Sequence, residues 1–181
     1  MTWIHTRLGN KFDLLRPNES VIDVVDIAHA LSLLCIFTGH SASFYSVAQH
    51  SVHVSHALVN ESVEVQMCGL LHDAAEAYVG DVSHPLKRLL PDYIAIEKRV
   101  EGAVFSAFGL PHTPPVSVKY ADLTLLATER RDLMPPSEDI WVIIDGIAPL
   151  PTTIVPWSPE QACAEFLEHY EYLKGAQHES S

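Results

Sequence analysis

The amino-acid sequence predicts an all-α fold, a single compact bundle of about six helices. Apolar residues recur at the three- and four-residue spacing of an amphipathic helix in six stretches, each bounded by glycine, proline or a polar cap. Hydrophobic residues make up 48% of the 181 residues, enough to bury a core without disulfides or a structural metal. We therefore expect one domain over residues 1–181.

The predicted helices follow one another along the chain and cover residues 27–37, 45–59, 63–78, 93–108, 116–134 and 160–173. Where these helices would end stand Gly39, Gly80, Gly109 and Gly175, and near helix starts stand Pro91, Pro114, Pro115 and Pro159. Residues 141–157 are β-branched and interrupted by proline, so we expect a loop with a short strand that pairs with residues 2–6 near the N-terminus. Residues 176–181 are expected to form a frayed tail.

The chain is acidic, because 23 aspartates and glutamates outnumber 11 lysines and arginines and leave a formal net charge of −12. Surfaces that coat DNA or RNA owe most of their affinity to lysine and arginine, so a polynucleotide is not an expected partner. A small phosphorylated ligand is compatible with this charge, provided that a bound dication and a few local cations reverse the field at the site.

Nothing in the sequence indicates export or a membrane span. Cys35, Cys68 and Cys163 lie far apart and form no CxxC pair, so we expect buried free thiols rather than disulfides or a thiolate zinc site. The N-terminus has no apolar leader, and charged and polar side chains interrupt the longest apolar stretch, residues 21–37. We therefore expect a cytoplasmic protein with no membrane partner.

The stretch LLHDAAEAYVGD, residues 70–81, carries a histidine and three carboxylates among small apolar residues. On a helix, His72 and Asp73 lean toward one point, and Glu76 lies on the same face one turn further on. Buried carboxylates need partners, and no lysine or arginine occurs between residues 17 and 86. Imidazole and carboxylate suit a first-row divalent metal ion, with further ligands from other helices.

The HD pair at residues 72–73 resembles the HD-domain superfamily of metal-dependent phosphohydrolases, whose signature is a His, then His-Asp, then a distant Asp. The resemblance spans residues 26–135. VAQHS at residues 47–51 is similar to the family's V-A-E-H-S helix, and KYAD at residues 119–122 is similar to its K-x-A-D helix. The resemblance implies a Zn, Mn, Co or Fe ion, with Mg as a candidate second ion, and its implied metal ligands are His50, His72, Asp73 and Asp122.

The run HDAAEAYVGDVSHPLK, residues 72–87, resembles a loop of bacterial 5′-deoxynucleotidases in which a Glu and an Asp after the HD pair serve catalysis. The matching residues here are Glu76 and Asp81, and Glu76 would accept a proton from water. We expect Lys87 and Arg88 to contact phosphate, and Phe37 to contact the substrate. The compact length is similar to that of small phage dATP triphosphohydrolases.

One position departs from the bacterial 5′-deoxynucleotidases, which carry an arginine followed by an aromatic residue ahead of the first metal histidine. Ile36 stands at the arginine position here, followed by Phe37. The departure weakens the case for a monophosphate substrate, and the candidates to supply the missing cation are Arg7, Lys11 and Arg16.

The resemblance implies an enzyme that hydrolyses phosphate ester or anhydride bonds of a small deoxynucleotide, first of all a dATP-type deoxynucleoside triphosphate, through attack of metal-activated water on phosphorus. Two alternatives stay open: a 5′-deoxynucleotidase that releases phosphate from deoxynucleoside monophosphates, and a catalytically idle, metal-stabilised nucleotide-sensing module. The presence of Glu76 and Asp81 counts against the idle module, because a site without catalytic activity would need neither carboxylate. The resemblance also implies a homo-oligomer.

Several of these residues also have a purely structural interpretation. A lone histidine such as His50 is more often a core or surface residue than a ligand, and the helix dipole alone would favour Asp122 in a first helical turn. His53 and His56 follow at intervals of three, which walks around the helix axis, so we leave them out of the site. Lys87, after a loop that contains proline, is of a kind that is usually solvated.

Overall fold

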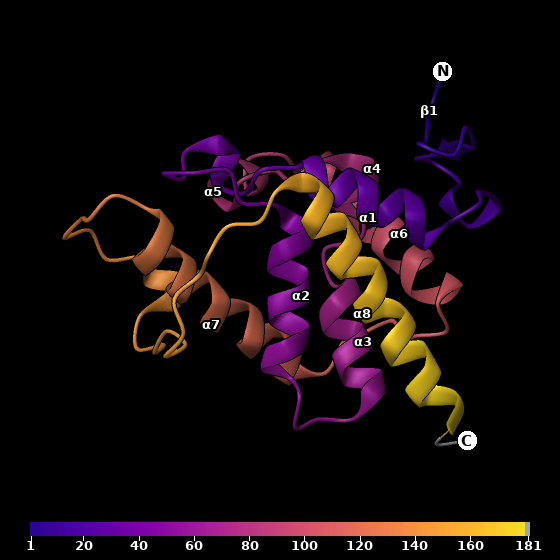
Figure 1. Cartoon of the computed structure of the whole chain (residues 1–181). Helices are drawn as coiled ribbons and strands as arrows, with labels where there is room; N and C mark the ends of the chain where they lie inside the picture. The colour runs from indigo at the N-terminus through magenta and orange to yellow at the C-terminus, as the bar shows by residue number, and fades with distance from the viewer. Residues whose placement is uncertain (180–181) are drawn as a thin grey trace.

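Helices dominate the structure, a computed structural model that describes residues 1–179 (Figure 1). The α-helices are α1 (Val24–Leu33), α2 (Val47–Ala57), α3 (Val63–Leu71), α4 (Glu76–Val79), α5 (His84–Lys87), α6 (Pro91–Ala107), α7 (Val116–Leu133) and α8 (Pro159–Glu179). Short 3-10 turns are η1 (Pro17–Glu19), η2 (Ile36–Gly39) and η3 (Val142–Ile144), and the strands are β1 (Trp3–His5) and β2 (Lys11–Asp13). The all-α prediction is confirmed. Over residues 1–179, no helix combines the length and the apolar character needed to cross a membrane.

The longer helices lie where the sequence predicts them, with shifted ends. Helix α1 starts earlier than the predicted range 27–37, because the carboxylate of Asp23 caps its first turn by accepting from Val25 N at 2.8 Å. The helix ends at Leu33, where the backbone of Leu34 becomes extended. The single helix predicted over residues 63–78 is divided into α3 and α4. Helix α8 continues through Gly175, so the predicted tail is helical as far as Glu179; residues 180–181 lie outside the described part.

The two strands form an antiparallel hairpin at the N-terminus. The prediction of a short β pairing there is confirmed, but the predicted partner is wrong, since residues 141–157 form a loop with one 3-10 turn. Burial explains the choice: Phe12 of β2 is fully buried and stacks on Tyr78 of α4, with the ring centroids 3.8 Å apart. The register pairs Trp3 with Asp13, Ile4 with Phe12 and His5 with Lys11.

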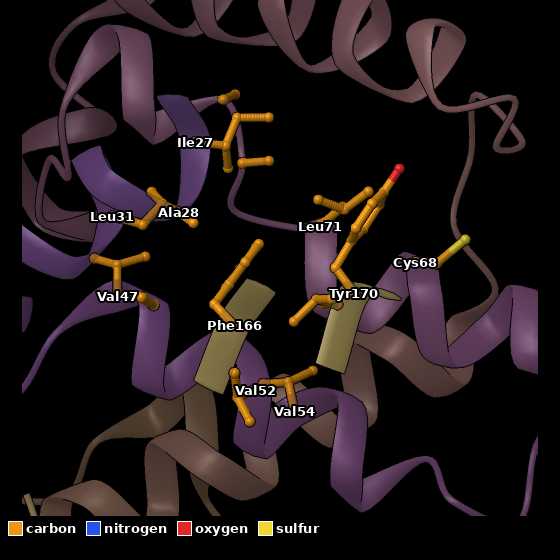
Figure 2. Packing of buried hydrophobic residues seen from close by; sticks show 14 of the residues in the cluster. Ile27, Ala28, Leu31, Val47, Val52, Val54, Cys68, Leu71, Phe166 and Tyr170 are labelled. Atoms are coloured by element: carbon orange, nitrogen blue, oxygen red, sulfur yellow. The ribbon is translucent and has the colours of Figure 1, made fainter. Parts of the chain in front are cut away.

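The hydrophobic core lies where α8 packs across α1, α2 and α3 (Figure 1). Figure 2 shows Phe166 of α8 between Ala28 of α1 and Val52 of α2, and all three side chains are buried. Burying a side chain of this size contributes about 1.5–3 kcal/mol. The last helix of the chain therefore fixes α2 and α3, although it follows them by about a hundred residues of sequence. The cysteines are free, as predicted, but of the three only Cys68 is buried, whereas Cys35 and Cys163 are partly exposed.

Helices α2 and α3 approach each other closely at Gly69. A Cβ at this position would lie 2.6 Å from Leu58 Cδ1 and 3.2 Å from Ser55 Cα. The backbone at Ser55 cannot turn aside as the end of a side chain can, so a larger residue would push α3 away from α2. The close approach sets the spacing between His50 on α2 and His72, which directly follows α3.

Gln49 ties α2 to the segment that precedes α8. Its buried Nε2 donates to Val155 O at 2.8 Å, and its Oε1 accepts from Trp157 N at 2.8 Å. One bond uses the NH2 group of the side-chain amide as a donor, and the other uses its oxygen as an acceptor. A carboxylate at this position has no donor for the Val155 carbonyl. This double contact is a physical reason for glutamine where the similar HD-domain motif has glutamate.

Gln49→Glu should therefore destabilise the fold. The variant loses the bond to Val155 O and buries a carboxylate against that carbonyl oxygen, so the free energy of unfolding should fall by about 3 kcal/mol. Urea denaturation followed by circular dichroism measures the change. The matched control is Gln161→Glu on the exposed surface of α8, which should stay within about 0.5 kcal/mol of the parent. Equal stability of the two variants would contradict the role given to Gln49.

Candidate metal centre

Two histidines from different helices meet at one point. His50 lies in the middle of α2 and is only 6% exposed, while His72 caps the C-terminal end of α3. The Nε2 atoms of the two rings are 3.3 Å apart. The close packing of α2 on α3 therefore brings together two ligand atoms that are distant in sequence.

The outer nitrogens of both rings are already engaged. His50 Nδ1 is 2.6 Å from Glu129 Oε1, and His72 Nδ1 is 2.8 Å from Gly69 O. A carboxylate and a carbonyl accept hydrogen bonds, so both Nδ1 atoms carry a proton and donate. In the neutral rings, the two Nε2 atoms then point lone pairs at each other. A cation shared between them relieves this repulsion, so the donor set fits a metal ion.

Two carboxylates complete the cluster. Asp122 on α7 places Oδ1 3.4 Å from His50 Nε2 and 4.0 Å from His72 Nε2. Asp73 places Oδ2 3.1 Å from His72 Nε2 and 3.6 Å from His50 Nε2. Atoms that each lie about 2.1 Å from one ion are separated from one another by roughly 3–4 Å, so these distances fit a single cation.

His50, His72 and Asp122 could hold a metal ion, since their ligand atoms all lie within 4.8 Å of one another. With Asp73 added, two neutral imidazoles and two carboxylates balance the charge of a dication. The structure thus brings together all four residues for which the HD resemblance implies metal binding. The identity of the ion, and the part of Asp73 in holding it, stay predictions.

When no cation is bound, protons can take its place. Burial lowers the pKa of His50, but Glu129, Asp122 and Asp73 outweigh it and hold that pKa well above 6.5. Burial likewise lowers the pKa of His72, and Asp73 more than compensates, so this pKa is also raised. Burial raises the pKa of Asp122, yet the two imidazoles reverse the effect and lower it below 3.8.

The HD pair lies in a break between two helices rather than inside one. Ala74 N donates to Leu71 O at 3.0 Å, and Glu76 N donates to Asp73 O at 2.9 Å. These bonds span three residues, as in a 3-10 turn, and separate α3 from α4. The prediction of one continuous helix is wrong at this place, and the break puts Glu76 at the start of α4.

The cluster opens into a cavity of about 510 Å³. Its charged lining includes Asp73, Glu76, Asp81, Asp122, Lys87 and Lys119. Its apolar lining includes Ile36, Phe37, Leu123, Leu126, Trp141 and Ile143. A cavity that combines a few convergent charges with an apolar wall has the character of a small-molecule site.

Both predicted catalytic carboxylates line this cavity. Glu76 is 8% exposed, and burial together with the nearby Asp73 and Asp81 raises its pKa well above the usual range. Asp81 follows Gly80, whose φ of 80° ends α4, and burial and Asp73 raise the pKa of Asp81. Carboxyl groups with raised pKa values in a cavity are candidates for proton transfer.

Two lysines bring positive charge to the cavity. Lys87 Nζ lies 2.7 Å from Glu97 Oε1. Burial lowers the pKa of Lys87, but the charge and hydrogen bond of Glu97 outweigh burial and raise this pKa, so the ammonium stays charged. Lys119 Nζ lies 2.7 Å from Asp122 Oδ2. Asp122 thus turns one oxygen to Lys119 and the other to the histidines. Lys119 was not among the predicted substrate contacts.

Four other cations lie away from the cavity. Arg88 is exposed and does not belong to the cavity lining. Arg7, Lys11 and Arg16, the candidates to replace the missing family arginine, do not line this cavity either, and their role stays a prediction. Lys11 lies over a tryptophan ring, Arg16 pairs with carboxylates of the N-terminal segment, and Arg7 lines a different cleft.

Phe37 lines the cavity from the η2 turn in an unusual backbone conformation. Phe37 and Thr38 both adopt positive φ, 53° and 55°, a region that residues with a Cβ rarely occupy. Trp141 packs edge-on against the Phe37 ring with centroids 5.8 Å apart, and the Arg130 guanidinium lies 5.1 Å from the Trp141 ring centroid. Strain of this kind persists where the surroundings hold it, often at binding sites.

No family model matches the chain. The protein is 41% identical over 177 residues to the uncharacterized protein YfdR of Escherichia coli (strain K12), with 96% of each chain covered. The chain belongs to the YfdR family. This YfdR-family chain is also 32% identical over 126 residues to the uncharacterized protein RCAP_rcc00048 of Rhodobacter capsulatus, which covers 66% of this chain and 64% of that protein.

Sequence reasoning missed one buried residue of the site in this YfdR-family chain. Glu129 contacts the outer nitrogen of His50 and is 1% exposed. A signal for it was present, because Asp122 and Glu129 are seven residues apart and so lie on one face of α7. No sequence pattern shows which histidine such a carboxylate reaches.

Metal binding by the YfdR-family protein should strengthen as the pH rises. When a chelator removes the metal, protonation of His50 and His72 stabilises the fold at pH values below 6.5, the pKa of the unfolded state. This stabilisation is lost as the pH rises through the higher pKa values that the two histidines have in the folded protein. A cation competes with these protons, so its affinity should rise by roughly tenfold per pH unit for each displaced proton.

Thermal unfolding with and without Co²⁺ at pH 6 and pH 8 measures this effect. We expect a larger upward shift of Tm at pH 8. His72→Ala should abolish the shift, whereas His40→Ala, which changes an exposed histidine outside the site, should retain it. An equal shift at both pH values would contradict imidazole ligation.

Proposed function

We propose that this YfdR-family protein is an HD-domain metal-dependent phosphohydrolase of a small deoxynucleotide, with a dATP-type deoxynucleoside triphosphate as the first candidate substrate. The observation that carries the proposal is the convergence of two imidazole lone pairs and two carboxylates at 3.1–4.0 Å in a cavity of about 510 Å³. His50, His72, Asp73 and Asp122 are also the four positions that match the HD signature.

A divalent cation held by these four residues would supply Lewis acidity toward water and a phosphoryl oxygen. Glu76 accepts the proton of the attacking water, for which its buried position and raised pKa suit it. The water oxygen bonds to phosphorus, and the bond from phosphorus to the leaving oxygen breaks. Asp81, whose pKa is also raised, gives the leaving oxygen its proton.

The rest of the cavity lining binds the substrate. Lys87 and Lys119 contact the phosphate oxygens as point charges, because they are the two lysines that line the cavity. Phe37 and Trp141 offer ring surface on which a base can pack. The aromatic pair and the lysines thus account for the two chemically different halves of a nucleotide.

Glu76→Gln tests the catalytic role. The amide cannot accept the proton, so kcat should fall by roughly 10²–10⁴-fold, while bound metal measured by elemental analysis stays the same. The assay measures hydrolysis of deoxynucleotides with Mn²⁺ or Co²⁺. The matched control is Glu64→Gln on the exposed face of α3, which should keep full activity. Full activity in Glu76→Gln would remove this residue from the mechanism.

The charge of the cavity favours a second candidate, a 5′-deoxynucleotidase. Five carboxylates line the cavity along with two lysines, and each lysine already has a carboxylate partner at 2.7 Å. An acidic cavity repels a triphosphate more strongly than a monophosphate. A monophosphate substrate therefore needs less charge compensation than the first candidate does.

Product analysis separates the two candidates. With dATP as substrate, we expect tripolyphosphate and deoxyadenosine, resolved by ion-exchange chromatography. Release of a single phosphate from dAMP, without turnover of dATP, would instead select the 5′-deoxynucleotidase. A metal-loaded protein that binds deoxynucleotides and hydrolyses none of a mono-, di- and triphosphate panel would contradict the proposal in favour of a sensing module.

A further inference from the structure

We infer that Glu129 is a positioning residue that holds the imidazole of His50 in the tautomer able to bind the cation. The inference deepens the proposed function and rests on its metal centre. It assigns a role to a buried carboxylate that neither the HD signature nor the proposed chemistry uses.

The contact between the two side chains is short and shielded from water. Glu129 Oε1 lies 2.6 Å from His50 Nδ1, and the side chains are 2% and 8% exposed. Burial and the charge of Glu129 raise the pKa of the nearby Tyr45 hydroxyl, which stays neutral. A buried carboxylate is costly unless a partner compensates, and the partner of Glu129 is an imidazole rather than a lysine or arginine.

Helix α7 holds His50 at both ring nitrogens. Asp122 Oδ1 lies 3.4 Å from Nε2, and Glu129, two turns further along the same face, reaches Nδ1. A neutral imidazole carries one proton, and Glu129 keeps it on Nδ1 because a carboxylate accepts hydrogen bonds there. Nε2 is then left with its lone pair directed at His72 and the two aspartates.

The second histidine is fixed by other means, which makes the effect of Glu129 specific. His72 Nδ1 donates to the backbone carbonyl of Gly69, a contact that no side-chain substitution at residue 129 removes. Loss of the Glu129 carboxylate therefore frees the ring of His50 alone. Its proton can then move to Nε2, and the site loses one of its two nitrogen ligands.

The test compares Co²⁺ dissociation constants of the full-length wild-type protein with those of Glu129→Met and Glu129→Gln. Methionine fills much of the same space without an acceptor, so binding should weaken about 10–100-fold. Glutamine keeps a neutral acceptor oxygen, so its loss should be smaller. The control is Asp26→Asn, since Asp26 is a carboxylate of similar burial on α1, and wild-type affinity is expected.

A nuclear magnetic resonance measurement distinguishes positioning from general stability. With saturating Zn²⁺, the wild-type protein should show a slowly exchanging proton on His50 Nδ1, and Glu129→Met should lose it. A folded Glu129→Met protein with wild-type Co²⁺ affinity overturns this inference alone. A wild-type protein that binds no Co²⁺ overturns the metal centre of the proposed function, and this inference with it.

Discussion

The 3.3 Å approach of His50 Nε2 to His72 Nε2 is the constraint on which the rest of the site depends. Helices α2 and α3 pack closely at Gly69, where a Cβ would lie 2.6 Å from Leu58 Cδ1 and 3.2 Å from Ser55 Cα. The Gly69 carbonyl also orients the His72 ring, so one residue sets both the distance and the direction. Two lone pairs held in this way have no favourable partner within the protein, and a cation or protons must compensate for them.

The carboxylates of the site lie in a part of the sequence that lacks basic residues. Between residues 17 and 86 the chain has no lysine or arginine, so Asp73, Glu76 and Asp81 lie in a region without fixed cations of their own. Lys87 is the first basic residue after this region, and its ammonium forms an ion pair with Glu97. Burial of so many acids around one cavity is therefore most simply balanced by a bound dication.

The segment that follows α7 supports the site from outside. Helix α8 packs across α1, α2 and α3 through residues such as Phe166, and Gln49 binds the segment that leads into it. The loop before it brings Trp141 against Phe37 at the wall of the cavity. The helices that carry the histidines are thus held by a segment that contributes no residue to the metal cluster.

The sequence by itself determined the helical class and the approximate extent of the longer helices, because apolar periodicity is a local property. The prediction of His50, His72, Asp73 and Asp122 as a metal-binding set came from the resemblance to the HD signature. Tertiary structure decided the rest. The break after α3, the pairing of β1 with β2, and the place of Glu129 beside His50 all depend on packing between distant segments. Periodicity places residues on the face of a helix, but it does not say which other helix that face meets.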